Sequence, residues 1–137
     1  MDKNVLKTII GEKHHEIAQV ELVKRPVIYE DSMSYVNVGI RRAGKSWLLY
    51  QDVKQRIADG KISIEDCLYI NFEDERIAGI TSQELGQFLD CYQEMFGLKK
   101  PLVYLDEIQN IDGWEKFVLR LASKITFTIP VWKWLLM

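Results

Sequence analysis

The sequence of 137 residues contains only two cysteines, and neither has a Cys-x-x-Cys partner. Cys67 and Cys91 are therefore expected to be buried, reduced side chains of a cytoplasmic protein rather than metal ligands or a disulfide. His14 and His15 lie in a polar helical segment that has no second cluster of ligands. We expect both histidines at the solvated surface.

Long apolar runs are also missing. No uninterrupted run is long enough to cross a bilayer, and the first residues are not followed by the apolar core of a signal peptide. The formal net charge is −2, so no basic surplus supports nucleic-acid binding. No internal repeat is present. These features predict a protein without a membrane partner.

What is present is the composition of a soluble globular domain, with 47% hydrophobic and 28% charged residues. The length suits one domain and is sufficient to bury a core. We expect a single partial domain with three parts. These are an N-terminal helix and connector over residues 1–34, a core over residues 35–129, and an atypical apolar tail over residues 130–137.

A glycine-rich loop over residues 39–46 fits the phosphate-binding (Walker A) pattern Gly-x₄-Gly-Lys-Ser. A β-prone segment over residues 35–38 precedes it, and a helix from about Lys45 to Ala58 follows. Backbone N–H groups in such a loop bind phosphates, and Gly39 and Gly44 permit the close approach. The residues expected to bind nucleotide are Gly39, Arg41, Arg42, Ala43, Gly44, Lys45, Ser46 and Trp47.

Two side chains of this loop have specific expected roles. Lys45 can reach the β- and γ-phosphates, and the Ser46 hydroxyl can bind Mg²⁺. The start of the following helix adds partial positive charge and unpaired N–H groups. The alternative is an ordinary glycine-containing turn between a strand and a helix.

Two further strands are predicted over residues 67–72 and 101–105, both largely apolar as in a parallel sheet buried on both faces. The second runs directly into Asp106 and Glu107, which is typical of a Walker B element. Asp106 would hold Mg²⁺ and its water indirectly, without binding the ion itself, and Glu107 would orient or deprotonate the attacking water. A surface loop that happens to carry two acids is the alternative.

The spacing of apolar residues predicts three more helices and one more strand. The helices are expected over residues 4–23, over residues 81–96 and from residue 113 to residue 121. Gly60 and Gly97 are expected to end the two helices that precede them. A fourth strand is predicted over residues 125–129, where Pro130 ends it.

Three segments stand in the order found in one known family: residues 39–46, residues 71–76, and residues 105–110 followed by Gly113-Trp114-Glu115. Over about residues 25–121 the sequence resembles prokaryotic AAA-type ATPases that carry a C-terminal domain of unknown function. The resemblance implies an α/β, three-layer αβα P-loop core whose mostly parallel sheet has the strand order 5-1-4-3-2. It also implies ATP and Mg²⁺ as ligands.

By the same resemblance, Asn71 at the end of the second strand would hold the catalytic Glu107 in check. A polar strand end without this role is the alternative for Asn71. The resemblance leaves two roles for Arg41 and Arg42: contact with phosphates or with a neighbouring subunit of a homo-oligomer, or a solvated position at the loop tip.

The sequence departs from this family after Leu121, because no Thr-Gly-Ser triplet follows to read the γ-phosphate. A truncated or frame-disrupted ATPase domain is therefore expected, one that binds Mg·ATP with weak or absent hydrolysis. Two other functions stay open. One is a non-catalytic interaction fragment that pairs through an open sheet edge or the apolar tail, and the other, DNA binding, depends on analogy with other AAA-type proteins alone.

Overall fold

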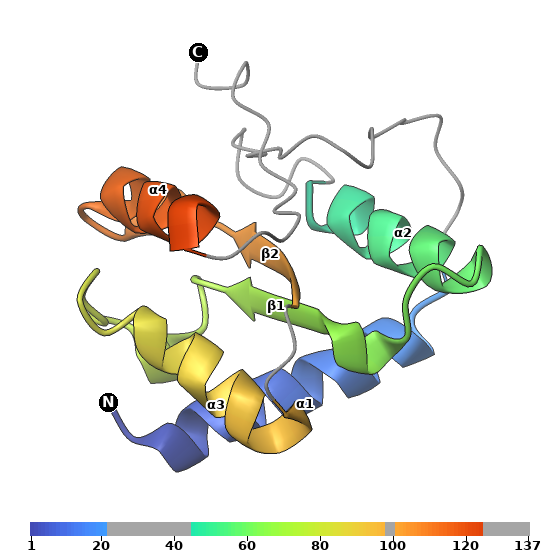
Figure 1. Cartoon of the computed structure of the whole chain (residues 1–137), viewed down its shortest axis with the longest axis horizontal. Helices are drawn as coiled ribbons and strands as arrows, with labels where there is room; N and C mark the ends of the chain where they lie inside the picture. The colour runs from blue at the N-terminus through green and yellow to red at the C-terminus, as the bar shows by residue number, and fades with distance from the viewer. Residues whose placement is uncertain (22–44, 98–100, 125–137) are drawn as a thin grey trace.

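The computed structural model describes residues 1–21, 45–97 and 101–124. For residues 45–48 and 121–124 it describes the backbone only. From the second described helix onward, α-helices and strands alternate along the chain (Figure 1). They are α1 (Lys3–Gln19), α2 (Lys45–Ala58), β1 (Cys67–Asn71), α3 (Gly86–Phe96), β2 (Leu102–Asp106) and α4 (Trp114–Lys124). Short 3-10 turns occupy Ile64–Asp66, Glu75–Ile77 and Ile108–Asn110.

The two described strands are parallel neighbours, with register running from Cys67 opposite Leu102 to Asn71 opposite Asp106. The connection between them contains α3, as a parallel crossover requires. The mixed α/β class and these two strands are confirmed. The strands predicted over residues 35–38 and 125–129 lie outside the described residues, so the order 5-1-4-3-2 stays a prediction.

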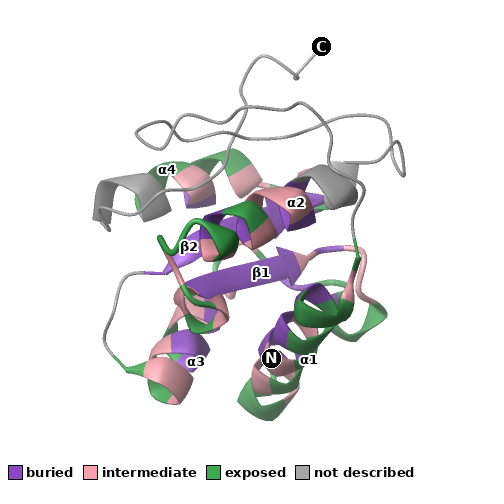
Figure 2. Ribbon diagram, turned by 90° about the vertical axis from the view of Figure 1, so that its right-hand side faces the viewer, coloured by how far each residue is buried: buried purple, intermediate pink, exposed green. Residues whose placement is uncertain are grey.

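Helices cover both faces of the strand pair, because successive side chains of a strand point to opposite faces. Tyr69 and Tyr104 face α2 and pack with Leu49 and Val53 of that helix. The alternate residues of both strands face α3 and α4 in a second apolar cluster. This cluster includes Leu68, Ile70, Val103 and Leu105 from the strands, Phe88 and Tyr92 from α3, and Phe117 from α4. Figure 2 shows β1 as a buried element between the helices.

Helix α1 runs beside the outer edge of β1 and contributes to both clusters (Figure 1). Ile10 packs into the α3 side, and Ile17 packs into the α2 side. His14 lies between them, and its Nε2 is 2.6 Å from the carbonyl oxygen of Cys67. Unpaired groups at a strand edge are a liability that proteins often cover. The side chain of His14 therefore satisfies a carbonyl on this edge.

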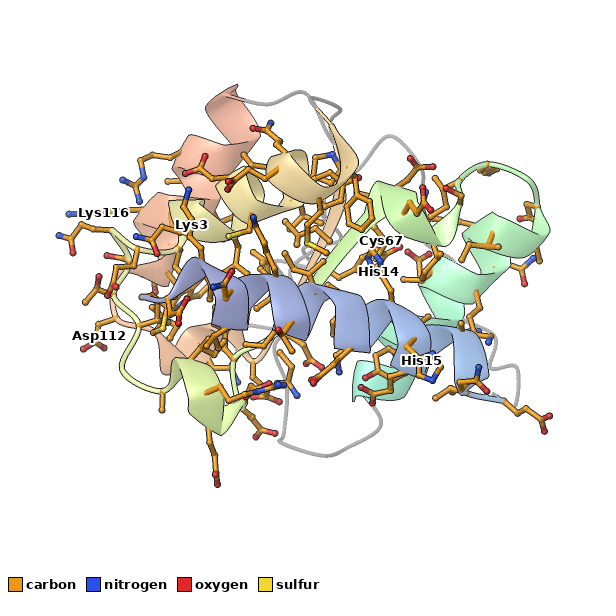
Figure 3. All side chains as sticks on the ribbon, turned by 90° about the horizontal axis from the view of Figure 1, so that it is seen from below. Lys3, His14, His15, Cys67, Asp112 and Lys116 are labelled. Atoms are coloured by element: carbon orange, nitrogen blue, oxygen red, sulfur yellow. The ribbon has the colours of Figure 1, made fainter. Side chains whose placement is uncertain are left out.

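The expectation that both histidines are solvated is wrong for His14, which is only 9% exposed. Figure 3 shows His14 beside Cys67 and His15 away from it. The reason is positional, since Ile10, His14 and Ile17 share one face of the helix at spacings of four and three residues. Burial lowers the pKa of His14, so the ring is neutral and donates through Nε2–H. His15 is exposed, as expected.

Several predicted helix ends are confirmed. α2 spans Lys45–Ala58 as expected. Gly60 and Gly97 follow α2 and α3 with φ of 74° and 90°, a region that glycine enters without the penalty of a Cβ. Both cysteines are buried and free, as predicted.

Two helix boundaries differ from expectation. α3 begins at Gly86 rather than near Thr81, because the preceding backbone forms turns, with Glu84 N–H bonded to the Thr81 carbonyl and Gln87 N–H to the Glu84 carbonyl. α1 ends at Gln19, short of the predicted residue 23. Within the described ranges, no helix combines the length and apolarity needed to cross a membrane.

Candidate functional site

The candidate site lies where β1 and β2 end. Asn71 and Asp106 are the last residues of the two strands and are register partners. Asp106 is two residues after Tyr104, so its side chain lies on the face covered by α2. It is 1% exposed, and the Tyr69 hydroxyl donates to its Oδ2 at 2.7 Å. An acid is therefore buried and oriented at the carboxyl edge of the sheet.

The next residue, Glu107, has a strained backbone. Its φ of 60° and ψ of 33° are left-handed, and it is the sole non-glycine residue with positive φ in the described part of the chain. Such conformations cost about 1–3 kcal/mol and cluster at functional sites. The side chain is 4% exposed, and Gln109 Nε2 donates to its Oε2. A buried, restrained glutamate thus follows Asp106 directly.

Helix α2 contributes its N-terminal end to the same region. It runs opposite to both strands, so its first turn lies on the side of the molecule where β1 and β2 end (Figure 1). Lys45 is the first residue of α2, and Ser46 and Trp47 follow it in the first turn. The partial positive charge of a helix N-terminus therefore lies on the side of the molecule where Asp106 ends β2.

The remaining residues predicted to bind nucleotide lie outside the described residues. They are Gly39, Arg41, Arg42, Ala43 and Gly44. The structure describes the backbone of Lys45, Ser46 and Trp47, at the end of α2 that lies on the same side of the molecule as the ends of β1 and β2 (Figure 1).

Asn71 ends β1 through its own side chain, since Oδ1 accepts the N–H of Glu73 at 2.9 Å. The strand pairing also continues one bond further, with the Phe72 N–H donating to the Asp106 carbonyl at 2.9 Å. Asn71 lines a cavity of about 310 Å³ between β1 and α1, together with Lys13 and Arg76. The hydrogen bond described for the Asn71 side chain is thus with the backbone of the turn that follows β1.

A family model described as an AAA domain matches residues 32–129. The chain belongs to this family. Helix α1 precedes the matched residues, so the helix that covers the edge of β1 lies outside the AAA domain match.

Two curated proteins are similar to this AAA domain chain. An uncharacterized protein of Methanocaldococcus jannaschii is 33% identical over 124 residues, which cover 88% of this chain and 26% of that protein. An uncharacterized protein of Haemophilus influenzae is 34% identical over 95 residues, covering 68% of this chain and 22% of that protein. The chain therefore spans about a quarter of the length of these relatives. No solved structure matches it significantly.

The residues of the AAA domain edge suit a magnesium ion held together with a nucleotide. Mg²⁺ prefers oxygen ligands and is usually bound by one or two carboxylates plus substrate phosphates and waters. Asp106 supplies one buried, oriented carboxylate at the end of β2, on the α2 face of the strand pair. Among the described residues, no three His, Cys, Asp or Glu side chains form a group that could hold a metal by themselves.

Sequence reasoning missed two residues of this site, Tyr69 and Gln109. Tyr69 lies in a largely apolar strand, and no sequence motif indicates a role for its hydroxyl group. Its contact with Asp106 depends on the register of two strands separated by a helix. Gln109 lies two residues after Glu107, and the left-handed conformation of Glu107 accompanies their contact. The sequence signal for Gln109 was its place in the segment over residues 105–110.

Proposed function

We propose that this AAA domain binds ATP with Mg²⁺ at the edge where α2 begins and where β1 and β2 end. The observation that carries the proposal is the position of Asp106. Its carboxylate is buried at the end of β2, on the α2 face, and α2 begins at Lys45 on the same side. A metal-binding carboxylate and a phosphate-binding helix start are the two halves of a P-loop nucleotide site.

The roles proposed for the remaining residues follow the chemistry of phosphates. Backbone N–H groups over residues 39–44 would surround the β- and γ-phosphates, and Lys45 would neutralise their charge. Ser46 and Asp106 would hold Mg²⁺, which neutralises charge on the phosphate oxygens when bound. Trp47 would contribute its N–H from the first turn of α2.

Glu107 is proposed to orient the attacking water. Its restrained conformation supports this role, because a catalytic base must be held in a productive position. Gln109 contacts Glu107 and is a candidate to control it, and Asn71 stays a second candidate. Arg41 and Arg42 are proposed to contact phosphates or a neighbouring subunit.

Turnover by the 137 residues is proposed to be weak. Phosphoryl transfer depends on electrostatic groups placed around the γ-phosphate. The sequence has the loop lysine and the two acids but lacks a Thr-Gly-Ser triplet after residue 121. Binding, which depends on the loop and Mg²⁺, should therefore be easier to measure than hydrolysis.

The proposal is tested by calorimetric titration of ATP into the purified chain, once with Mg²⁺ and once with EDTA. Lys45→Ala should abolish binding in both solutions, because it removes the cation that contacts the phosphates. Lys116→Ala removes a lysine from the exposed surface of α4 (Figure 3) and should change nothing. Equal ATP binding by the wild type and Lys45→Ala would contradict the proposed function. GTP in place of ATP measures base preference.

A further inference from the structure

We propose that Tyr69 is a positioning residue that holds the Asp106 carboxylate ready for Mg²⁺. This inference depends on the proposed function and adds a residue from the middle of β1 to the metal site. Tyr69 does not touch the metal in this proposal. It acts through a hydrogen bond to Asp106, the carboxylate proposed to hold the metal and its water.

The geometry is specific. The Tyr69 side chain is completely buried, and its hydroxyl donates to Asp106 Oδ2 at 2.7 Å. A carboxylate turns broadly about its last torsion, so a bond to one oxygen fixes the plane of the group. Bonds from a hydroxyl to a charged oxygen are among the stronger ones in proteins.

Three neighbours fix the Tyr69 ring in turn. Tyr104 stacks on it with centroids 5.8 Å apart and planes 14° apart, and Tyr50 contacts it edge-on at 5.1 Å. The Lys13 ammonium lies 5.3 Å from its centroid. Lys13 belongs to α1, which precedes the residues matched by the family model. Support for Asp106 thus extends to a helix outside the AAA domain match.

The expected effect lies in metal binding. Residues that hydrogen-bond to metal ligands typically change metal affinity by about 10–100-fold when they are lost. We define the metal gain as the ratio of ATP affinity in Mg²⁺ to ATP affinity in EDTA. Tyr69→Phe should lower the metal gain about tenfold and leave ATP affinity in EDTA unchanged.

Tyr104→Phe is the matched control. Tyr104 is the register partner of Tyr69, is equally buried, and takes part in the same stack. Its hydroxyl instead donates to Asp52 Oδ2 at 2.5 Å. Both variants lose one buried hydroxyl, so a merely structural effect would appear in both. The metal gain of Tyr104→Phe should equal that of the wild type.

The outcomes separate the two proposals. Equal metal gains for Tyr69→Phe and Tyr104→Phe would overturn the role of Tyr69 while leaving nucleotide binding intact. Absence of ATP binding by the wild type would instead remove the proposed function. Combining Tyr69→Phe with Asp106→Asn should add no further loss, because the hydroxyl acts through the carboxylate. A further loss in the double variant would count against the inference.

A second measurement avoids dependence on the folding of the variants. In the wild-type chain with ¹³C-labelled tyrosine, adding Mg²⁺ to the ATP complex should shift the ring signal of Tyr69 more than that of Tyr104. Tyr69 contacts the proposed metal ligand directly, whereas Tyr104 contacts Asp52. Equal shifts of the two signals would overturn the inference.

Discussion

The two faces of the strand pair differ in chemistry. On the side of α3 and α4, the strands present only aliphatic side chains, which pack against apolar neighbours such as Phe88. On the side of α2, they present two tyrosines and Asp106, and both hydroxyls bond to carboxylates. One face buries apolar side chains, and the other orients carboxylates through tyrosine hydroxyls. The proposed site therefore uses one face only.

Several polar side chains on or near the α2 face are paired with one another. Tyr104 donates to Asp52, which also forms an ion pair with Arg56 at 3.0 Å. Lys13 contacts the Tyr50 hydroxyl at 2.8 Å and Glu16 at 2.9 Å. Burial alone would lower the pKa of Lys13, but these hydrogen bonds raise it. Buried polar groups of this kind stabilise a fold only when they are paired.

The largest effect is expected on the apolar face. Phe88 is 1% exposed and contacts Phe72 edge-on, so Phe88→Ala should lower the free energy of unfolding by about 3–5 kcal/mol. Urea unfolding measures this loss. Leu119→Ala, at a position that is 70% exposed, should stay within about 0.5 kcal/mol of the wild type. Similar losses in both variants would show that the apolar face is not the stabilising one.

A smaller effect is expected at Glu107. Its left-handed backbone penalises any residue with a Cβ by about 1–2 kcal/mol. Glu107→Gly and Glu107→Ala both remove the carboxylate, but only glycine relieves the strain. Glycine loses more conformational freedom on folding, which offsets part of the relieved strain. We therefore expect the glycine variant to be more stable than the alanine variant by about 1 kcal/mol. Thermal unfolding of the two variants checks the difference, and a less stable glycine variant would contradict strain at this position.

The smallest effect is a pH dependence at α1. The folded-state pKa of His14 is below its ordinary value because of burial, so the unfolded chain binds the proton more readily. The stability that neutral His14 contributes is fully present above the pKa of this residue in the unfolded chain. It is lost as the pH falls through the lower pKa of His14 in the folded protein. The slope from one proton cannot exceed about 1.4 kcal/mol per pH unit.

His14→Gln should flatten this slope, because glutamine can still donate to the Cys67 carbonyl but does not titrate. His15→Gln, at an exposed position, is the control. Urea unfolding at a series of acidic pH values measures both slopes. If the slope of stability against pH is the same in His14→Gln as in the wild type, protonation of His14 does not cause the loss of stability at acidic pH.

Local patterns were sufficient to predict much of this fold. The glycine and lysine pattern placed the start of α2 at Lys45, and Gly60 and Gly97 followed their helices as expected. The two apolar runs predicted parallel strands that end near Asn71 and Asp106. These features are encoded within a few residues of one another, so a single sequence can reveal them.

The errors and omissions concern contacts between distant segments. His14 is polar, yet it is buried because it meets the carbonyl of Cys67, 53 positions along the chain. Tyr69 meets Asp106 across two strands, 37 positions apart. Neither contact follows from composition or periodicity, because each depends on how helices and strands pack. The register of the strands and the placement of α1 supplied what the sequence could not.

The most direct measurement is the metal gain of Asp106→Asn in the ATP titration. Asparagine keeps the size of the side chain and can still accept the Tyr69 hydroxyl, but it removes the negative charge that Mg²⁺ requires. Asp112→Asn, an exposed position (Figure 3), is the matched control. We expect Asp106→Asn to bind ATP equally well in Mg²⁺ and in EDTA, while Asp112→Asn keeps the wild-type metal gain. A wild-type metal gain in Asp106→Asn would contradict a Mg·ATP site at this edge of the sheet.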